Sequence, residues 1–208
     1  ATSSPATSSP ATSTSLGTST TLDPQTTSGV GSSTGFDELV LFDFWAEHCA
    51  LEWFVTSNNE PEVIPCDTKN DQFGWEEKRH LAPLNVEGAE VFVQALELAP
   101  ENLEGAVISG TLHDFPLTQP AEFISLVACK GGGDPCDATW QFVVRDADTL
   151  EAFVVKEGVE KPDGLIKPIY ADLEPYVGET VMISLVVIAN TGLAGDRLVW
   201  ETPQLLAK

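Results

Sequence analysis

The chain has 208 residues, with 10 basic and 32 acidic side chains and a formal net charge of −22. This length holds one sizeable core with an appendage but hardly two full domains. So strong a negative charge repels phosphate backbones and anionic lipid, which argues against nucleic-acid binding. No apolar run in the sequence is long enough to span a bilayer, so no transmembrane segment is expected.

Residues 1–35 differ sharply in composition from the rest of the chain. They begin with the repeat ATSSP, ATSSP, ATSTS, and 20 of the 35 are Ser or Thr. A segment with so few bulky apolar groups cannot offset its ordering entropy, so we expect an extended, irregular tail. Ser and Thr with Pro are typical of O-glycosylated stalks, although a bare flexible linker has the same composition. The candidate acceptors are Thr2, Ser3, Ser4, Thr7, Ser8, Ser9, Thr12, Ser13 and Thr14.

Residues 36–208 are expected to form a β domain. Its first part should contain strands at 36–45 and 51–56, a turn at 58–62, a polar and aromatic stretch at 72–80, and a loop at 83–88. Residues 89–98 suit a helix or a strand, and we choose a strand because the neighbouring segments are β.

Further strands are expected at 105–113, 122–129, 138–145, 150–156 and 166–173. Within them, Trp140, Phe142 and Val144 alternate with polar residues at the period of a strand that has one buried face. About ten short strands separated by turn signals predict an all-β, two-sheet antiparallel sandwich of the jelly-roll type.

The stretch from Thr180 to Leu206 predicts two closing strands joined by a short turn. Residues 181–189 are apolar except for Ser184 and rich in β-branched side chains, which is typical of a strand buried on both faces. Pro203 has no N–H to donate to a ladder, so strand pairing is expected to end there.

The four cysteines are expected to form two local disulfides. Cys129 and Cys136 flank the turn-rich loop KGGGDP at the tip of an expected hairpin, and closing so short a loop contributes about 2.5 kcal/mol in the chain-entropy model. Cys49 and Cys66 are the remaining pair. The crossed pairings and a zinc site are the alternatives. The cysteines lack C-x-x-C spacing, and the three histidines, His48, His80 and His113, are isolated in the sequence.

Paired cysteines indicate an oxidising compartment, so we expect a secreted protein at or outside the cell surface. The sequence begins with Ala rather than Met, which leads us to expect a mature product from which a signal peptide has been removed.

The C-terminal 85 residues or so resemble a known group of secreted bacterial proteins. The resemblance rests on Cys129 with Cys136, Asp172–Leu173, Val177–Gly178 with Val181, Gly195–Asp196–Arg197, Trp200 and Pro203. These parts are similar to galactose-binding-like jelly-roll modules, including the NPCBM-type carbohydrate-binding domains. The resemblance implies a jelly-roll fold and a possible carbohydrate partner. One departure is Gln204, where the group often has Arg.

Neither a common catalytic motif nor a complete EF-type calcium loop is present, so we expect a protein that is not an enzyme and has no required cofactor. Asp146 with Asp148, and Asp134 with Asp137, are weak Ca²⁺ candidates because their carboxylates supply oxygen ligands. The alternative interpretation is that these four residues are ordinary solvent-exposed acids.

Trp75 is the candidate sugar platform. The other four tryptophans lie in apolar alternation, whereas Trp75 stands among Asp71, Glu76 and Arg79. An exposed ring can stack on a sugar face while neighbouring polar groups bond its hydroxyls. The alternative is a tryptophan that closes the edge of the sandwich.

Two functions follow from these features. The first is a subunit of a secreted filament or surface assembly, a homo-oligomer or polymer joined through residues 1–35. Two modes of attachment are open: the tail adds a strand to a neighbouring sheet, or, since it lacks alternating bulky residues, it wraps over a neighbour's surface. The alternative is a secreted carbohydrate-binding module on a flexible O-glycosylated stalk.

Overall fold

The computed structural model describes residues 39–57, 60–82, 84–87, 89–91, 94–131, 135–192 and 195–208. The tail with its candidate O-glycosylation sites and the calcium candidate Asp134 lie outside these ranges. The predictions made for them therefore stay predictions.

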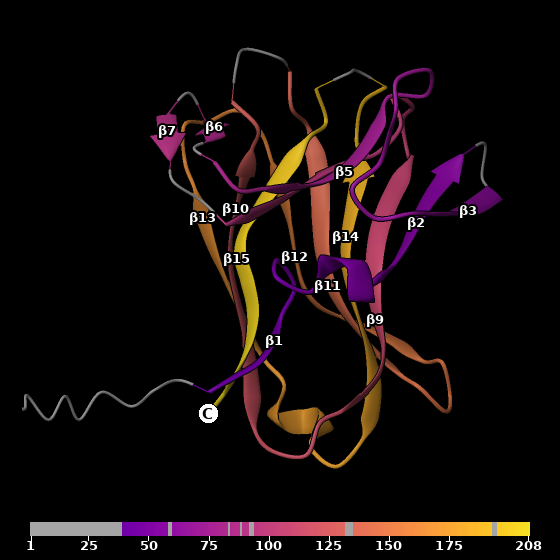
Figure 1. Ribbon diagram of the computed structural model, residues 1–208, viewed down its shortest axis with the longest axis vertical. Coiled ribbons are helices and arrows are strands. Elements are labelled where there is room, and N and C mark those ends of the chain that lie inside the picture. Colours follow the sequence, from indigo (N-terminus) through magenta and orange to yellow (C-terminus); the bar gives the residue numbers. More distant parts are fainter. Residues whose placement is uncertain are drawn as a thin grey trace, which may run out of the picture. The chain divides into compact units, whose positions relative to one another are not determined.

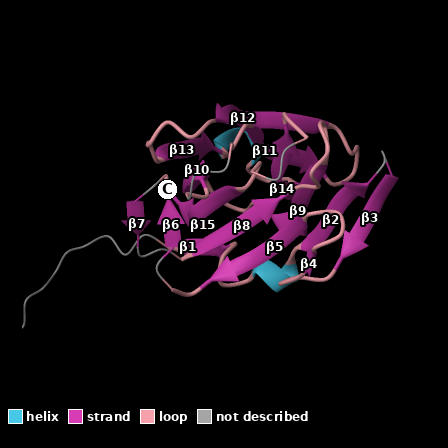
Figure 2. Cartoon of the chain, turned by 90° about the horizontal axis from the view of Figure 1, so that it is seen from above, coloured by secondary structure: helices cyan, strands magenta, loops and turns pink. Residues whose placement is uncertain are grey.

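The fold is an antiparallel β-sandwich, which confirms the predicted fold class (Figure 1). Sheet A has the order β13 (Lys167–Asp172), β10 (Ala121–Cys129), β15 (Leu198–Ala207), β8 (Ala95–Ala99), β5 (Trp75–His80) and β4 (Lys69–Asn70), with β1 (Val40–Asp43) also paired to β15. Sheet B has the order β12 (Ala152–Glu160), β11 (Ala138–Asp146), β14 (Thr180–Ala189), β9 (Val107–Pro116), β2 (Glu52–Ser57) and β3 (Glu60–Ile64). Figure 2 shows the two sheets as two rows of strands.

Three small elements complete the described chain. The hairpin of β6 (Leu84–Val86) and β7 (Ala89–Val91) forms a separate two-stranded sheet. Two short 3-10 turns, η1 (His48–Ala50) and η2 (Glu174–Tyr176), lie in connections. Over the described residues, no helix has the length and apolar character needed to cross a membrane.

The core lies between the two sheets and follows from the period of two along each strand. In β14, Val181, Ile183, Leu185 and Val187 are buried while the residues between them are half-buried. Aromatic rings join the layers: Phe123 of sheet A stacks on Phe142 of sheet B at 4.1 Å between centroids. Such interlocked apolar burial is the main favourable term in the folding of this domain.

The outer faces of the two sheets differ. The β6–β7 hairpin covers part of the outer face of sheet A, where Leu84 and Val86 join a second buried cluster with Ala95, Ala128 and Val199. The corresponding face of sheet B carries outward side chains from β2, β9, β14 and β11 that are half-buried or exposed. Sheet B therefore presents the more open surface.

Several strands form where a turn, a loop or an unassigned stretch was expected. β3 begins inside the predicted turn at 58–62, β6 inside the predicted loop at 83–88, and β5 inside the polar stretch 72–80. β4 was not expected either. Periodicity did not reveal these strands because β3 and β4 are edge strands, β5 lies next to the edge and β6 belongs to a two-stranded hairpin, so much of their surface can be polar.

The two expected hairpins are instead crossings between sheets. β14 belongs to sheet B and β15 to sheet A, so the last connection does not join neighbouring strands. The same holds for β10 and β11, which the KGGGDP loop connects. The burial pattern of a strand shows which of its faces is buried. It does not show to which of the two sheets the strand belongs.

Pro203 does not end its strand, contrary to the prediction. β15 runs to Ala207 because its register with β10 shifts between Ile124 and Leu126, a bulge that accommodates residues near Pro203. The preceding Thr202 has φ +43°, and the Pro203 carbonyl accepts a hydrogen bond from the Phe44 N–H at 3.0 Å. A proline at a bulge removes no ladder bond.

Both disulfides are present with the predicted local pairing. Cys49–Cys66 has a sequence separation of 17 and Cys129–Cys136 a separation of 7. The first links η1 to the segment before β4, and the second links the end of β10 to the segment before β11. The second disulfide therefore ties the two sheets together at one end.

Candidate functional site

A groove of about 820 Å³ lies on the outer face of sheet B. Its lining combines apolar groups with hydroxyl, amide, imidazole and guanidinium groups. The lining residues are Phe54, Thr56, Pro61, Ser109, Thr111, His113, Gln141, Val143, Arg145, Leu150, Ala152, Val154, Met182, Ser184 and Val186. A volume of this size falls within the range of ligand sites in proteins.

Strand alternation explains why these side chains meet. On β11, Trp140, Phe142 and Val144 point into the core, which turns Gln141, Val143 and Arg145 outward. The neighbouring strands do the same in register, since Thr111 of β9 pairs with Ser184 of β14. The Thr111 and Ser184 hydroxyls lie 2.8 Å apart and hydrogen-bond each other.

The groove differs in charge from the rest of the molecule. None of its lining residues is acidic, although the chain has 32 Asp and Glu. His113 contacts Glu52 at 2.8 Å from just outside the lining, whereas Arg145 has no ion-pair partner among the described residues. The surface therefore suits a neutral or weakly anionic polar ligand.

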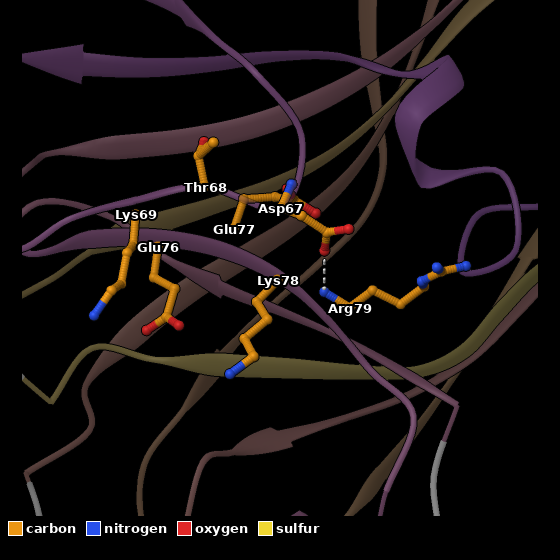
Figure 3. A pocket seen from close by; sticks show the side chains of 7 residues that line it. All are labelled: Asp67, Thr68, Lys69, Glu76, Glu77, Lys78 and Arg79. Carbon is orange, nitrogen blue, oxygen red and sulfur yellow. Dashed lines mark hydrogen bonds between the residues drawn. The ribbon is translucent and has the colours of Figure 1, made fainter.

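A second, smaller pocket of about 390 Å³ lies along β4 and β5 at the edge of sheet A (Figure 3). Its lining consists of Asp67, Thr68, Lys69, Glu76, Glu77, Lys78 and Arg79. Glu76 and Arg79 of the predicted sugar-binding group both line this pocket, but their side chains lie on opposite faces of β5. Asp71 lies outside the lining and forms an exposed ion pair with Lys69 at 3.0 Å.

The prediction of an exposed ring at Trp75 is wrong. Only 7% of Trp75 is exposed, and it belongs to the main core cluster. The side chains of β5 alternate, so the polar neighbours Glu76 and Lys78 point to the opposite face. The polar surroundings in sequence therefore misled the prediction, and the alternative of a tryptophan at the sandwich edge describes the position better.

Arg79 makes its contact with a different tryptophan. Its guanidinium carbon lies 5.4 Å from the ring centroid of Trp45, whose Nε1 donates to the His80 carbonyl at 2.9 Å. Glu76 accepts a hydrogen bond from Arg197 at 2.8 Å. The polar groups of the predicted site are thus already engaged with the protein itself.

Beside the small pocket, His48, Asp67 and Glu77 form a cluster. One potential ligand atom from each lies within 4.8 Å of the others. His48 Nε2 lies 3.0 Å from Asp67 Oδ2, and the Asp67 N–H donates to Glu77 Oε2. His48 and Glu77 are buried, while about half of the Asp67 side chain faces solvent.

The electrostatics of this cluster differ between its two acids. Burial raises the pKa of Glu77 to about 7, despite the hydrogen bond from the Asp67 N–H. Burial also opposes ionisation of Asp67, but hydrogen bonds from the Arg79 N–H and from His48 outweigh it and lower the pKa of Asp67. His48 looks isolated in the sequence because its partners Asp67 and Glu77 lie 19 and 29 positions further along the chain.

A second acidic cluster, Glu87 with Glu160 and Asp163, has a different character. Lys167 Nζ lies 2.9 Å from Glu160 and 3.0 Å from Asp163, so a cation of the protein already occupies the centre. Glu87 accepts the backbone N–H groups of Cys129 and Gly164. This cluster is a structural ion-pair network.

The described calcium candidates have structural contacts of their own. Asp146 Oδ1 accepts the N–H groups of Asp148 and Thr149 in the turn after β11, and these bonds lower its pKa. Asp137 accepts a hydrogen bond from Asn190 at 2.9 Å and pairs with Lys161 at 3.0 Å. The structure does not bring these residues together into a ligand cluster within the described part of the chain.

No protein-family model matches the chain, and no curated protein matches it. Similar solved structures include tandem family 51 carbohydrate-binding modules of a family 98 glycoside hydrolase from Streptococcus pneumoniae, at 15% identity and TM-score 0.46, covering 71% of this chain and 45% of that one. Another is a family 51 module from Clostridium perfringens in complex with methyl-galactose, at 15% identity and TM-score 0.40, covering 64% and 88%. A cyclase from Fischerella has 13% identity and TM-score 0.44, covering 76% and 85%.

The chain spans 45% of the first of these structures and 29% of a Clostridium thermocellum xylanase that also has a similar fold. The set contains carbohydrate-binding modules of the kind that the sequence resembles, together with a cyclase. At these scores the similarities assign neither a family nor a ligand to the chain.

Proposed function

We propose that this chain is a secreted, non-enzymatic carbohydrate-binding module whose binding surface is the groove on sheet B. The observation that carries the proposal is the composition of that groove. It combines apolar side chains with hydroxyl and amide groups and has no acidic lining residue, on a protein with a net charge of −22. A sugar chain needs this mixture, because its ring faces are apolar and its rims carry hydroxyls.

Three contacts in the groove define how a sugar would be held. Phe54 supplies an aromatic face from β2, suited to stacking against a pyranose ring. Gln141 offers its amide oxygen and a second N–H from β11, since its Nε2 already donates to Glu157 at 3.3 Å, and Arg145 offers five donors without a competing ion pair among the described residues. The Thr111–Ser184 hydroxyl pair lies between these strands and can exchange its mutual bond for bonds to the ligand.

The two disulfides support a secreted location, because such bonds persist in oxidising compartments. The alternative prediction, a filament subunit joined through residues 1–35, concerns a segment outside the described residues. It stays a prediction.

The proposal is tested by a glycan array with the full chain, followed by titration of each glycan that binds. We expect Gln141→Ala and Arg145→Ala to weaken binding at least about 10-fold, since each removes hydrogen bonds to the ligand. Gln72→Ala is the matched control, because Gln72 is exposed in the turn before β5, on the other sheet. An array without binding, or a glycan whose affinity neither groove variant changes, would overturn the proposal.

A further inference from the structure

We propose that His48, Asp67 and Glu77 form a binding site for a divalent transition-metal ion of the Zn²⁺ class. The site is independent of the sheet B groove, since none of these residues lines it. Their ligand atoms gather within 4.8 Å from three separate segments: η1, the connection before β4, and β5. Imidazole and carboxylate groups are the donor types that hold zinc in many proteins.

Two buried polar atoms of the cluster have no hydrogen-bond partner in the described part of the chain. They are Nδ1 of His48 and Oε1 of Glu77. The Glu77 side chain has no solvent exposure at all, and His48 is only 3% exposed. An orphaned, fully buried carboxylate oxygen is costly, because it lost its water without gaining a partner. A bound cation would remove that cost for Glu77.

The His48–Asp67 geometry suits a shared ion. Two ligand atoms about 2.0 Å from a tetrahedral metal lie about 3.3 Å apart. His48 Nε2 and Asp67 Oδ2 are 3.0 Å apart, which is a hydrogen-bonding distance. Zinc binding would replace the proton of this hydrogen bond and would need the two atoms to move apart by only a few tenths of an ångström. The other oxygen, Oδ1, accepts the Arg79 N–H at 3.1 Å, which orients the carboxylate as outer groups do around metal ligands.

The surrounding structure fixes the three ligands in place. The Cys49–Cys66 disulfide joins the residue after His48 to the residue before Asp67, with 5.3 Å between their Cα atoms. Asp67 has φ +52°, a left-handed conformation that a non-glycine residue rarely adopts without compensation. The Glu77 N–H bonds to the Thr68 carbonyl at 2.9 Å and aligns β5 with this segment.

The cluster can also be reached from solvent on its Asp67 side. Glu77 is fully buried, but about half of the Asp67 side chain is exposed where it lines the 390 Å³ pocket of Figure 3, so an ion can approach the cluster from the Asp67 side. Three basic side chains, Lys69, Lys78 and Arg79, also line this pocket, but none of them forms an ion pair with Asp67 or Glu77 among the described residues. Lys69 pairs with Asp71, and the Arg79 guanidinium lies over the Trp45 ring. In the Glu87 cluster, by contrast, Lys167 takes the place that an ion would need.

The test is calorimetric titration of the full chain with ZnCl₂ after treatment with a chelator. Millimolar Ca²⁺ is present to occupy non-specific cation sites on the acidic surface. We expect one Zn²⁺ per chain and a rise in Tm of about 5–10 °C at a free concentration of 100 Kd. Glu77→Gln should weaken Zn²⁺ binding at least about 10-fold, because it removes a ligand charge while keeping the side-chain shape. Asp71→Asn is the matched control, since it removes one exposed acidic charge nearby but outside the cluster.

A second measurement covers the case in which Glu77→Gln fails to fold. Anomalous diffraction at the zinc edge from crystals of the unmodified protein should place the ion between His48 and Asp67. Zinc located elsewhere, absence of one-to-one binding, or equal affinity in Glu77→Gln and Asp71→Asn would each overturn the proposal.

Discussion

Glu97 and Lys130 form an ion pair with a 2.7 Å contact in which the carboxylate is completely buried. Glu97 lies in the middle of β8, and Lys130 directly follows β10. The same carboxylate contacts His80 at 2.7 Å and Arg197 at 3.0 Å, and Arg197 also binds Glu76. A buried charge is tolerated here because three basic side chains surround it.

Glu97 should make the domain sensitive to acid. Burial alone would raise its pKa, but the hydrogen bonds and charges of His80 and Lys130 outweigh it and lower the pKa to about 2. A carboxyl whose pKa is lower in the folded state stabilises the protein at pH values above its unfolded-state pKa. This contribution is lost as the pH falls from about 4.5 to about 2. The shift corresponds to about 3 kcal/mol.

The check is the free energy of unfolding in urea for the original protein and Glu97→Gln at a series of pH values. We expect the variant to be less stable at pH 7 and the difference to shrink toward pH 2. Glu62→Gln, an exposed position on β3, serves as the control. A difference that stays constant with pH would contradict this assignment.

Trp75→Ala should destabilise the whole domain rather than act on a ligand alone. The ring is 93% buried in the core, and removing such a side chain costs about 3–5 kcal/mol. Phe73→Ala, at a position that is 43% exposed, should cost far less. Urea unfolding of both variants is the measurement, and equal stability of the two would show that Trp75 is not a core residue.

Gly110→Ala should also be destabilising, because a Cβ at this position would lie 2.4 Å from the Trp53 ring. Trp53 is buried and holds its Nε1 on the His48 carbonyl at 2.9 Å, so the ring cannot move away freely. We expect a loss of about 1–3 kcal/mol. Gly192→Ala is the control, since its nearest atom is at 3.5 Å; thermal unfolding should separate the two variants.

The two disulfides should differ in their contributions to stability. In the chain-entropy model, replacing Cys129 and Cys136 by Ser costs about 2.5 kcal/mol, and replacing Cys49 and Cys66 costs about 3 kcal/mol because the loop is longer. Denaturant unfolding without reductant measures both. A larger loss for the shorter loop would mean that the link between the two sheets contributes more than loop closure.

The sequence by itself determined the fold class, most strand positions and the disulfide pairing. These follow from local signals: the period-two burial of segments such as Ala138–Asp146, and two cysteines, Cys129 and Cys136, that flank a short loop and leave Cys49 and Cys66 as the remaining pair. It missed β3, β4, β5 and β6, since strands near the sheet edge and in the small hairpin need no continuous apolar pattern. It also placed Trp75 outside the core because its neighbours in sequence are charged.

Only the tertiary structure decided which surfaces exist. The groove on sheet B joins residues from β2, β9, β14, β11 and β12, whose order in the sheet differs from their order in the chain. Likewise, His48, Asp67 and Glu77 meet through a disulfide and a strand pairing, and Glu97 gains its three basic partners from β5 and from residues next to β10 and β15. Hydrophobic periodicity records which face of a strand is buried, whereas the neighbours across a sheet depend on long-range pairing that a local pattern does not encode.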